Sequence, residues 1–145
     1  MYNVNRVGIE NAKNSISLFI CLSLTNSIFV FMNIPISFIF SDFISFVGAV
    51  LLHMRVYHMI AYSCFLIPLV LLGLSCYLAD KNKFGFILAI IVSILDILVI
   101  VYLCIYISGF SWFYVLPVIG DGWLIIDCAK GLHNFNILEK FKDNE

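Results

Sequence analysis

The sequence predicts an all-α fold, an integral membrane bundle of four transmembrane helices with one short additional helix at the outer face. Of the 145 residues, 63% are hydrophobic and only 12% are charged, and the mean hydropathy is +1.06, far from the composition of soluble domains. The apolar residues also gather in runs of about twenty, the length at which a helix crosses a hydrocarbon core of about 30 Å. We therefore expect a single transmembrane domain, residues 15–128, between polar ends.

Four apolar runs supply the expected spans, and each is long enough to cross the hydrocarbon core as a helix. A polar cytoplasmic segment, residues 1–14, precedes the first run, and the segment 129–145 follows the last. The expected spans are residues 15–34, 59–79, 84–107 and 110–128.

The segment 129–145 carries a regular apolar pattern beside lysine residues. Its apolar residues recur every three positions and are Leu132, Phe135, Leu138 and Phe141. Such a pattern is typical of a short amphipathic helix, and lysines favour contact with lipid headgroups. We therefore predict a cytoplasmic tail whose helix lies on the membrane surface.

Residues 36–58 form a hydrophobic excursion for which the sequence leaves two arrangements open. Asp42 is suited to cap a helix that starts at Phe43, because its carboxylate can accept the free backbone N–H groups of the first turn. From Phe43 to Met54 such a helix is only about 18 Å long, which is too short to cross. The segment is therefore either a short outer-face helix, interfacial or re-entrant, or part of a fifth span.

The placement of Lys and Arg favours four spans, because these residues are retained on the cytoplasmic side. With four spans and both termini inside, seven of the 8 are cytoplasmic and only Arg55 lies outside. With five spans the best division is five against three. We therefore expect a multi-pass protein of the cell membrane, embedded in the lipid bilayer, with both termini in the cytoplasm.

The run 84–107 carries one carboxylate, Asp96, near its middle. A charge at the bilayer centre costs roughly 2.5 to 3.5 kcal/mol on insertion scales, so Asp96 is expected to face protein or water. The residues on its side of the helix are mostly small or polar, which lets neighbouring helices approach closely. They are Gly85, Ala89, Ser93, Ile100, Cys104 and Ser108.

Asn26, Asp96 and Asp121 come to similar depths when each span is counted inward from its ends, and no Lys or Arg does. If the three meet, they form a carboxylate pair with an amide neighbour, in which low dielectric and mutual repulsion favour a held or shared proton. Such an intramembrane polar site could bind a proton or a small cation. The alternative is that the two carboxyl groups hold helices together, each contact contributing on the order of 0.6 to 2 kcal/mol.

Intramembrane aspartyl proteases also place two aspartates on neighbouring spans, one of them in a Gly-x-Gly-Asp motif. Here the stretch that ends in Asp121 reads Val-Ile-Gly-Asp and lacks the first glycine, and Leu95 precedes Asp96 where those enzymes have tyrosine. The chain also has fewer expected spans than those enzymes. We therefore do not expect an enzyme, and no motif indicates a cofactor.

His53, Arg55 and His58 fall together at the outer face in the four-span arrangement. The two histidines are five positions apart and do not share one helical face as an i, i+4 pair does, which argues against a metal site. We interpret the three as an outer-interface basic cluster whose side chains reach toward lipid headgroups.

Two roles remain for a protein of this kind. The soluble parts are too small for a catalytic domain and four helices enclose little cavity, so we favour a non-catalytic interaction protein. Such a protein is an accessory subunit of a membrane complex or an immunity-type protein, with other membrane subunits or a second copy as partner. The alternative is a small transport or channel-type component that uses Asp96 and Asp121. No pattern indicates binding to nucleic acid.

Overall fold

The computed structural model describes residues 2–34, 42–105 and 112–142. Within these ranges the chain forms five helices: α1 (Tyr2–Phe31), α2 (Phe43–His53), α3 (His58–Ala79), α4 (Phe84–Leu103) and α5 (Trp112–Lys142). Three of them, α1, α3 and α4, are long and apolar enough to cross a membrane. The all-helical bundle predicted from the sequence is therefore confirmed.

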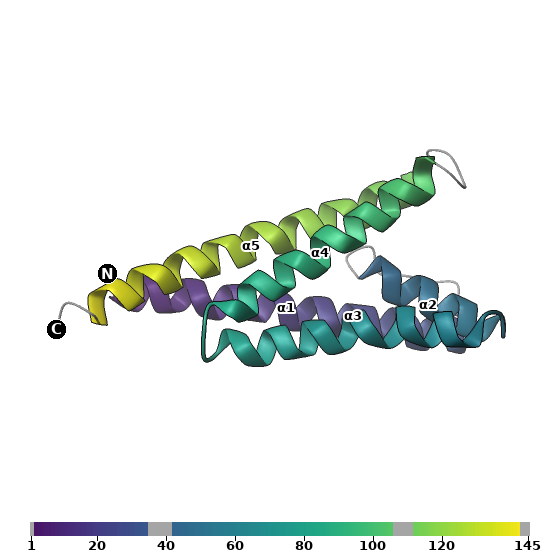
Figure 1. Cartoon of the computed structure of the whole chain (residues 1–145), viewed down its shortest axis with the longest axis horizontal. Coiled ribbons are helices and arrows are strands. Elements are labelled where there is room, and N and C mark those ends of the chain that lie inside the picture. Colours follow the sequence, from purple (N-terminus) through teal and green to yellow (C-terminus); the bar gives the residue numbers. More distant parts are fainter. Residues whose placement is uncertain (1, 35–41, 106–111, 143–145) are drawn as a thin grey trace.

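The four long helices run lengthwise, and Figure 1 shows how they are arranged. α1 lies against α5, and α4 packs against both α3 and α5. The start of α1, the turn between α3 and α4, and the end of α5 lie at the left in Figure 1, which we call the terminal end. The turn between α2 and α3 lies at the opposite end, which we call the far end. The short helix α2 packs on α3 and α1 and extends from the interior to the far end.

The core lies where these helices meet, and small residues allow close approach. Gly85 at the start of α4 is the clearest case, because a Cβ there would lie 2.2 Å from the backbone nitrogen of Ala79 on α3. Ser75 donates its hydroxyl to the Gly85 carbonyl oxygen at 2.8 Å across the same contact. The predicted inward stripe of α4 is confirmed as far as Ile100, since the buried residues of this helix are Gly85, Phe86, Ala89, Val92, Ser93, Asp96 and Ile100.

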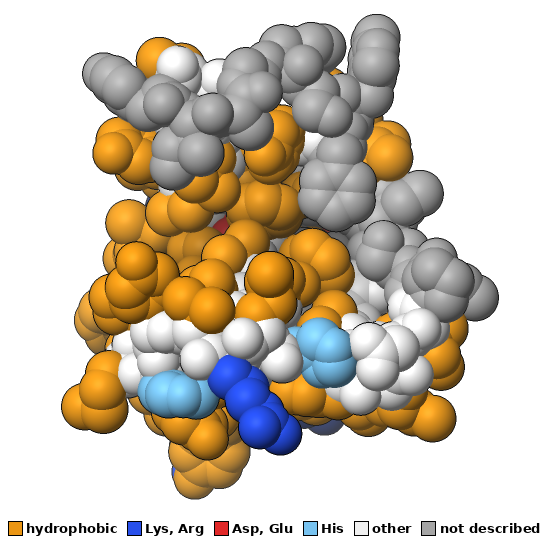
Figure 2. Space-filling view, turned by 90° about the vertical axis from the view of Figure 1, so that its right-hand side faces the viewer, with side chains coloured by type: hydrophobic (Ala, Val, Ile, Leu, Met, Phe, Trp, Pro, Cys, Tyr) orange, Lys and Arg blue, Asp and Glu red, His pale blue; other side chains and the backbone are white. Residues whose placement is uncertain are grey.

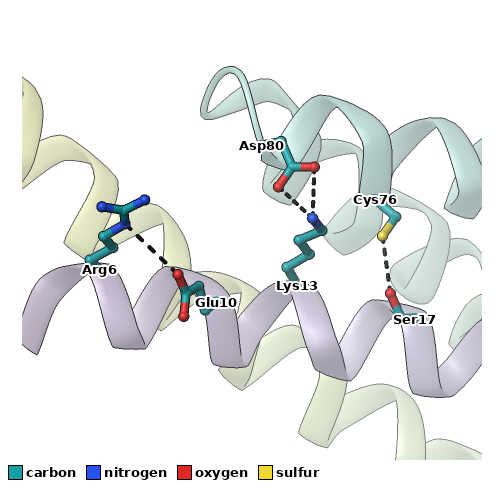
Figure 3. A network of polar contacts seen from close by, with 6 residues as sticks. All are labelled: Arg6, Glu10, Lys13, Ser17, Cys76 and Asp80. Atoms are coloured by element: carbon teal, nitrogen blue, oxygen red, sulfur yellow. Dashed lines mark hydrogen bonds and ion pairs between the residues drawn. The ribbon is translucent and has the colours of Figure 1, made fainter.

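Polar contacts join α1 to α3 near the terminal end, as Figure 3 shows. Lys13 on α1 donates to the two carboxylate oxygens of Asp80, just after α3, at 2.5 and 2.7 Å. One turn further along α1, Ser17 Oγ lies 3.1 Å from Cys76 Sγ. These contacts fix the lengthwise register of the two helices.

The tail that we predicted as a separate surface helix is instead part of α5, which runs without a break to Lys142. Leu132 and Phe135 pack against the buried core, and Glu139 forms an ion pair with Lys83 at 3.0 Å. The apolar face of the tail therefore covers the other helices. Periodicity alone revealed that this face is apolar but could not reveal that α1 and α4 extend far enough to meet it.

The remaining boundaries differ from the prediction by smaller amounts. α1 begins at Tyr2, so the polar amino-terminal segment is helical as well. It ends at Phe31 before a turn in which Asn33 has a φ of 56°. α3 begins one residue before its predicted span and ends with it. α4 ends at Leu103, and the last part of the predicted span 84–107 lies outside the described residues.

Candidate functional site

Asp96 lies in the middle of α4 and is 1% exposed. Its two carboxylate oxygens accept the backbone N–H groups of Phe43 and Ile44, each at 2.8 Å. These groups belong to the first turn of α2, where no earlier carbonyl of the helix can pair with them and where the helix dipole is positive. Asp96 therefore caps the start of α2 from another helix, and the same contacts stabilise its negative charge.

Asp42 is the N-cap of α2, as the sequence predicts, and it is also 1% exposed. Its carboxylate accepts the Ser45 backbone N–H at 3.3 Å and a short hydrogen bond from the Ser45 hydroxyl. The Asp42 N–H donates to Ser23 Oγ on α1 at 2.8 Å. The eleven-residue helix α2 is about 16 Å long and cannot cross a bilayer alone; it begins in the interior, held by α1 and α4.

Asp121 on α5 completes a group of three buried carboxyls with Asp42 and Asp96, which we call the carboxyl cluster. Its side chain is 1% exposed and interacts electrostatically with both of the others. Neither of its oxygens accepts a hydrogen bond from an N–H or hydroxyl donor among the described residues, and the same holds for Asp42 Oδ1. Both side chains instead lie within hydrogen-bonding reach of the Asp96 carboxyl. Two carboxyl groups can pair only when one of them holds a proton, so a proton is expected within the cluster.

No Lys or Arg in the described part of the chain pairs with the carboxyl cluster. The ion pairs found there use other carboxylates, namely Glu10, Asp80, Asp127 and Glu139. Three ionised carboxylates close together in a low dielectric would repel one another strongly. Asp96 has compensation from the start of α2, whereas Asp121 has none from the described residues. A proton or a small cation is the species that would neutralise the cluster.

The structure brings together two of the three residues predicted for this site, Asp96 and Asp121. Asn26 is also buried, one turn beyond Ser23 on α1, and Ser23 supplies the α1 contact to the cluster. Sequence reasoning recognised Asp42 as a helix cap but missed it as a member of the site. The cap itself was the signal for Asp42. A capped helix that is too short to span a membrane can begin in the middle of the membrane.

The second predicted group, the basic cluster of His53, Arg55 and His58, lies at the far end, away from the carboxyl cluster. All three residues are exposed, at the end of α2, in the following turn and at the start of α3. Figure 2 shows this end of the molecule, where a Lys or Arg side chain lies between two histidines. The three residues therefore lie at the same end of the described structure.

Comparisons of the chain with protein-family models, with curated proteins and with solved structures find no match. The chemistry of the carboxyl cluster is therefore the basis for a functional assignment. Its members can hold and exchange a positive charge, and they can position α2 against α4.

Proposed function

We propose that the protein spans the cell membrane four times, through α1, α3, α4 and the apolar first half of α5, with both termini in the cytoplasm. In α5 the polar residues Asp121, Asp127 and Lys130 interrupt the apolar sequence. Support for this fourth span comes from the ion pair between Lys83 and Glu139, which joins the start of α4 to the end of α5. If this pair forms on the cytoplasmic side, the chain crosses the membrane outward through α4 and returns through α5.

In this arrangement the terminal end is cytoplasmic and the far end is the outer face. α2 is then a re-entrant helix that starts at the depth of Asp96 and ends at His53 on the outer face. Discontinuous helices whose ends lie at ion sites near the bilayer midplane are a recurring device of transporters.

For the biochemical role, we propose a small transport or channel-type component that binds and releases a proton at the carboxyl cluster. The observation that carries this proposal is Asp121, a fully buried carboxyl group that accepts no hydrogen bond from an N–H or hydroxyl donor among the described residues and that interacts with the carboxyls of Asp96 and Asp42. In the described part of the chain, no three acidic, His or Cys side chains have the spacing of a metal site.

In this proposal, Asp96 and Asp121 of the carboxyl cluster have different roles. Asp96 accepts two backbone N–H groups at the start of α2 and so positions that helix. Asp121 holds the exchangeable proton, because the described residues offer its charge no N–H or hydroxyl donor and no cation, and its carboxyl lies within hydrogen-bonding reach of Asp96.

The test is proton flux into liposomes that contain the purified protein, driven by a potassium diffusion potential and read with a pH-sensitive dye. We expect flux for the wild type and its loss in Asp121→Asn, which keeps the shape of the side chain but cannot exchange a proton. Asp127→Asn is the matched control, because Asp127 lies on the same helix but binds Ser15 and Lys130 instead of the cluster. Flux in this control is expected to match the wild type.

A wild type that moves no more protons than empty liposomes overturns the proposal, and so does an Asp121→Asn variant with unchanged flux. Measurement of sodium uptake along a sodium gradient gives the other arm, in which sodium flux lost in the same variant would assign a cation instead. With neither flux, the interaction role expected from the sequence is the better assignment. Co-purification in mild detergent then identifies the partner.

A further inference from the structure

A hollow at the far end combines basic and apolar lining. It has a volume of about 400 Å³ and lies between the end of α1, the end of α2 and the first turns of α3. Arg55, His58 and Tyr62 line it with polar groups, whereas Phe31, Leu52 and Phe65 supply apolar surface. Phe31 and Phe65 meet edge to face, with ring centroids 6.3 Å apart, and fix one wall of the hollow.

We propose that this hollow binds an anionic phospholipid, with the phosphate at Arg55 and His58 and the start of an acyl chain against the phenylalanines. The charge of the hollow supports this occupant, because the described residues that line it include no carboxylate and form no ion pair with Arg55. A guanidinium group binds phosphate with two parallel hydrogen bonds. A ligand with both a phosphate and a hydrocarbon chain fits both kinds of lining.

The surroundings of the hollow support a position at the membrane surface. Tyr57, Met59 and Tyr62 are exposed by 71%, 84% and 55% at the far end. Tyrosine is the residue type that gathers at the level of lipid headgroups. In addition, no side chain caps the first turn of α3, which begins at His58, so the positive end of a 22-residue helix adds to the attraction for an anion.

The backbone conformation of Arg55 allows a substitution that removes its charge without straining the fold. The turn after α2 closes with hydrogen bonds from Val56 N–H to the Leu51 carbonyl oxygen and from Arg55 N–H to the Leu52 carbonyl oxygen, both at 3.1 Å. Arg55 has a φ of 57° in this turn, the left-handed conformation in which glycine is preferred at a helix end. Arg55→Gly therefore removes the cation while it relieves the backbone, and lost binding cannot be ascribed to a damaged fold.

The experiment measures binding of fluorescent phosphatidylglycerol to the detergent-solubilised protein, with phosphatidylcholine as the zwitterionic comparison. We expect tight binding of phosphatidylglycerol to the wild type and about tenfold weaker binding to Arg55→Gly, the loss expected for one charged hydrogen-bonding group. Arg55→Lys is expected to retain an intermediate affinity. Asn33→Gly is the matched control, since Asn33 also has a positive φ of 56° but carries no charge.

Three results would overturn the proposal. The first is equal binding of phosphatidylglycerol to the wild type and to Arg55→Gly. The unfolding temperature of both proteins is measured in the same detergent to compare their folded states. The second is equal binding of the two lipids to the wild type. The third is competition by glycerol phosphate as effective as that by unlabelled phosphatidylglycerol, which would assign a soluble phosphate ligand in place of a lipid.

Discussion

The carboxylate of Asp96 accepts the backbone N–H of Phe43 at 2.8 Å and so joins the middle of α4 to the first turn of α2. Through this bond, a side chain of α4 fixes the depth at which the short helix α2 begins. The bond also separates two uses of buried carboxyls, because Asp96 accepts backbone N–H groups of another helix and Asp121 accepts none among the described residues. The two residues are therefore expected to respond differently to the same substitution.

Asp96→Asn is expected to lower the free energy of unfolding by about 1 to 3 kcal/mol, the cost of one buried N–H group without a partner. The amide oxygen can accept one of the two N–H groups of α2, but the amide nitrogen then faces the other. Asp121→Asn removes no hydrogen bond with a backbone or hydroxyl donor among the described residues, and its amide can still reach the Asp96 carboxyl, so the variant is expected to unfold near the wild-type temperature. The measurement is thermal unfolding in a mild detergent, and equal destabilisation by both variants would contradict this assignment.

Gly85→Ala and Gly73→Ala are expected to change stability in opposite directions. A Cβ at Gly85 would overlap the backbone of Ala79, which is expected to cost about 1 to 3 kcal/mol because neither helix can yield without moving. A Cβ at Gly73 would meet nothing within 4 Å, and alanine there is expected to stabilise α3 by about 0.4 to 1 kcal/mol. Unfolding of both variants in one detergent tests whether α3 and α4 approach as closely as described.

Ser17→Cys is expected to form a disulfide with Cys76 under mild oxidation. The two side chains already meet across α1 and α3, with 3.1 Å between Ser17 Oγ and Cys76 Sγ, and a disulfide bond needs about 2.0 Å between sulfurs. Mass spectrometry of the digested protein reads the linked peptides. Leu18→Cys, exposed on another face of α1, is the control and should remain unlinked. Linking in the control alone would place α1 in a different rotation.

Cysteine labelling tests the four-span arrangement directly. In a variant without native cysteines, Val56→Cys is expected to react with an impermeant maleimide on intact cells, because it lies in the turn at the far end. Asn82→Cys and Asn136→Cys, at the terminal end, are expected to react only after the membrane is opened. Reaction of Asn136→Cys on intact cells would mean that α5 does not return to the cytoplasm.

Those parts of the fold that depend on local chemistry could be predicted from the sequence. The cap at Asp42 and the helix start at Phe43 follow from one side chain and its nearest backbone groups. The inward face of α4 follows from the spacing of its small residues and from the cost of exposing Asp96 to lipid. Each inference needed only the helix in question.

The parts that depend on distant segments could not be predicted in the same way. The meeting of Asp42 with Asp96 depends on the path of the chain between α1 and α2, and nothing near Asp42 reveals how deep its helix begins. The packing of Leu132 and Phe135 depends on the length of α1, whose polar start gave no periodic signal of its own. Counting residues inward from the ends of each span still predicted similar depths for Asp96 and Asp121, because both helices are nearly regular.

The hydrogen bond from Ser15 to Asp127, at 2.7 Å, joins residues 112 positions apart. If α1 and α5 span the membrane as proposed, α1 enters it during synthesis long before its partner α5 exists. Until α5 is made, the inward-facing residues of α1, among them Ile16 and Phe19, contact lipid or a helper protein. A ribosome that stalls before α5 would leave this half-assembled bundle open on one side, a form that membrane proteases are suited to recognise.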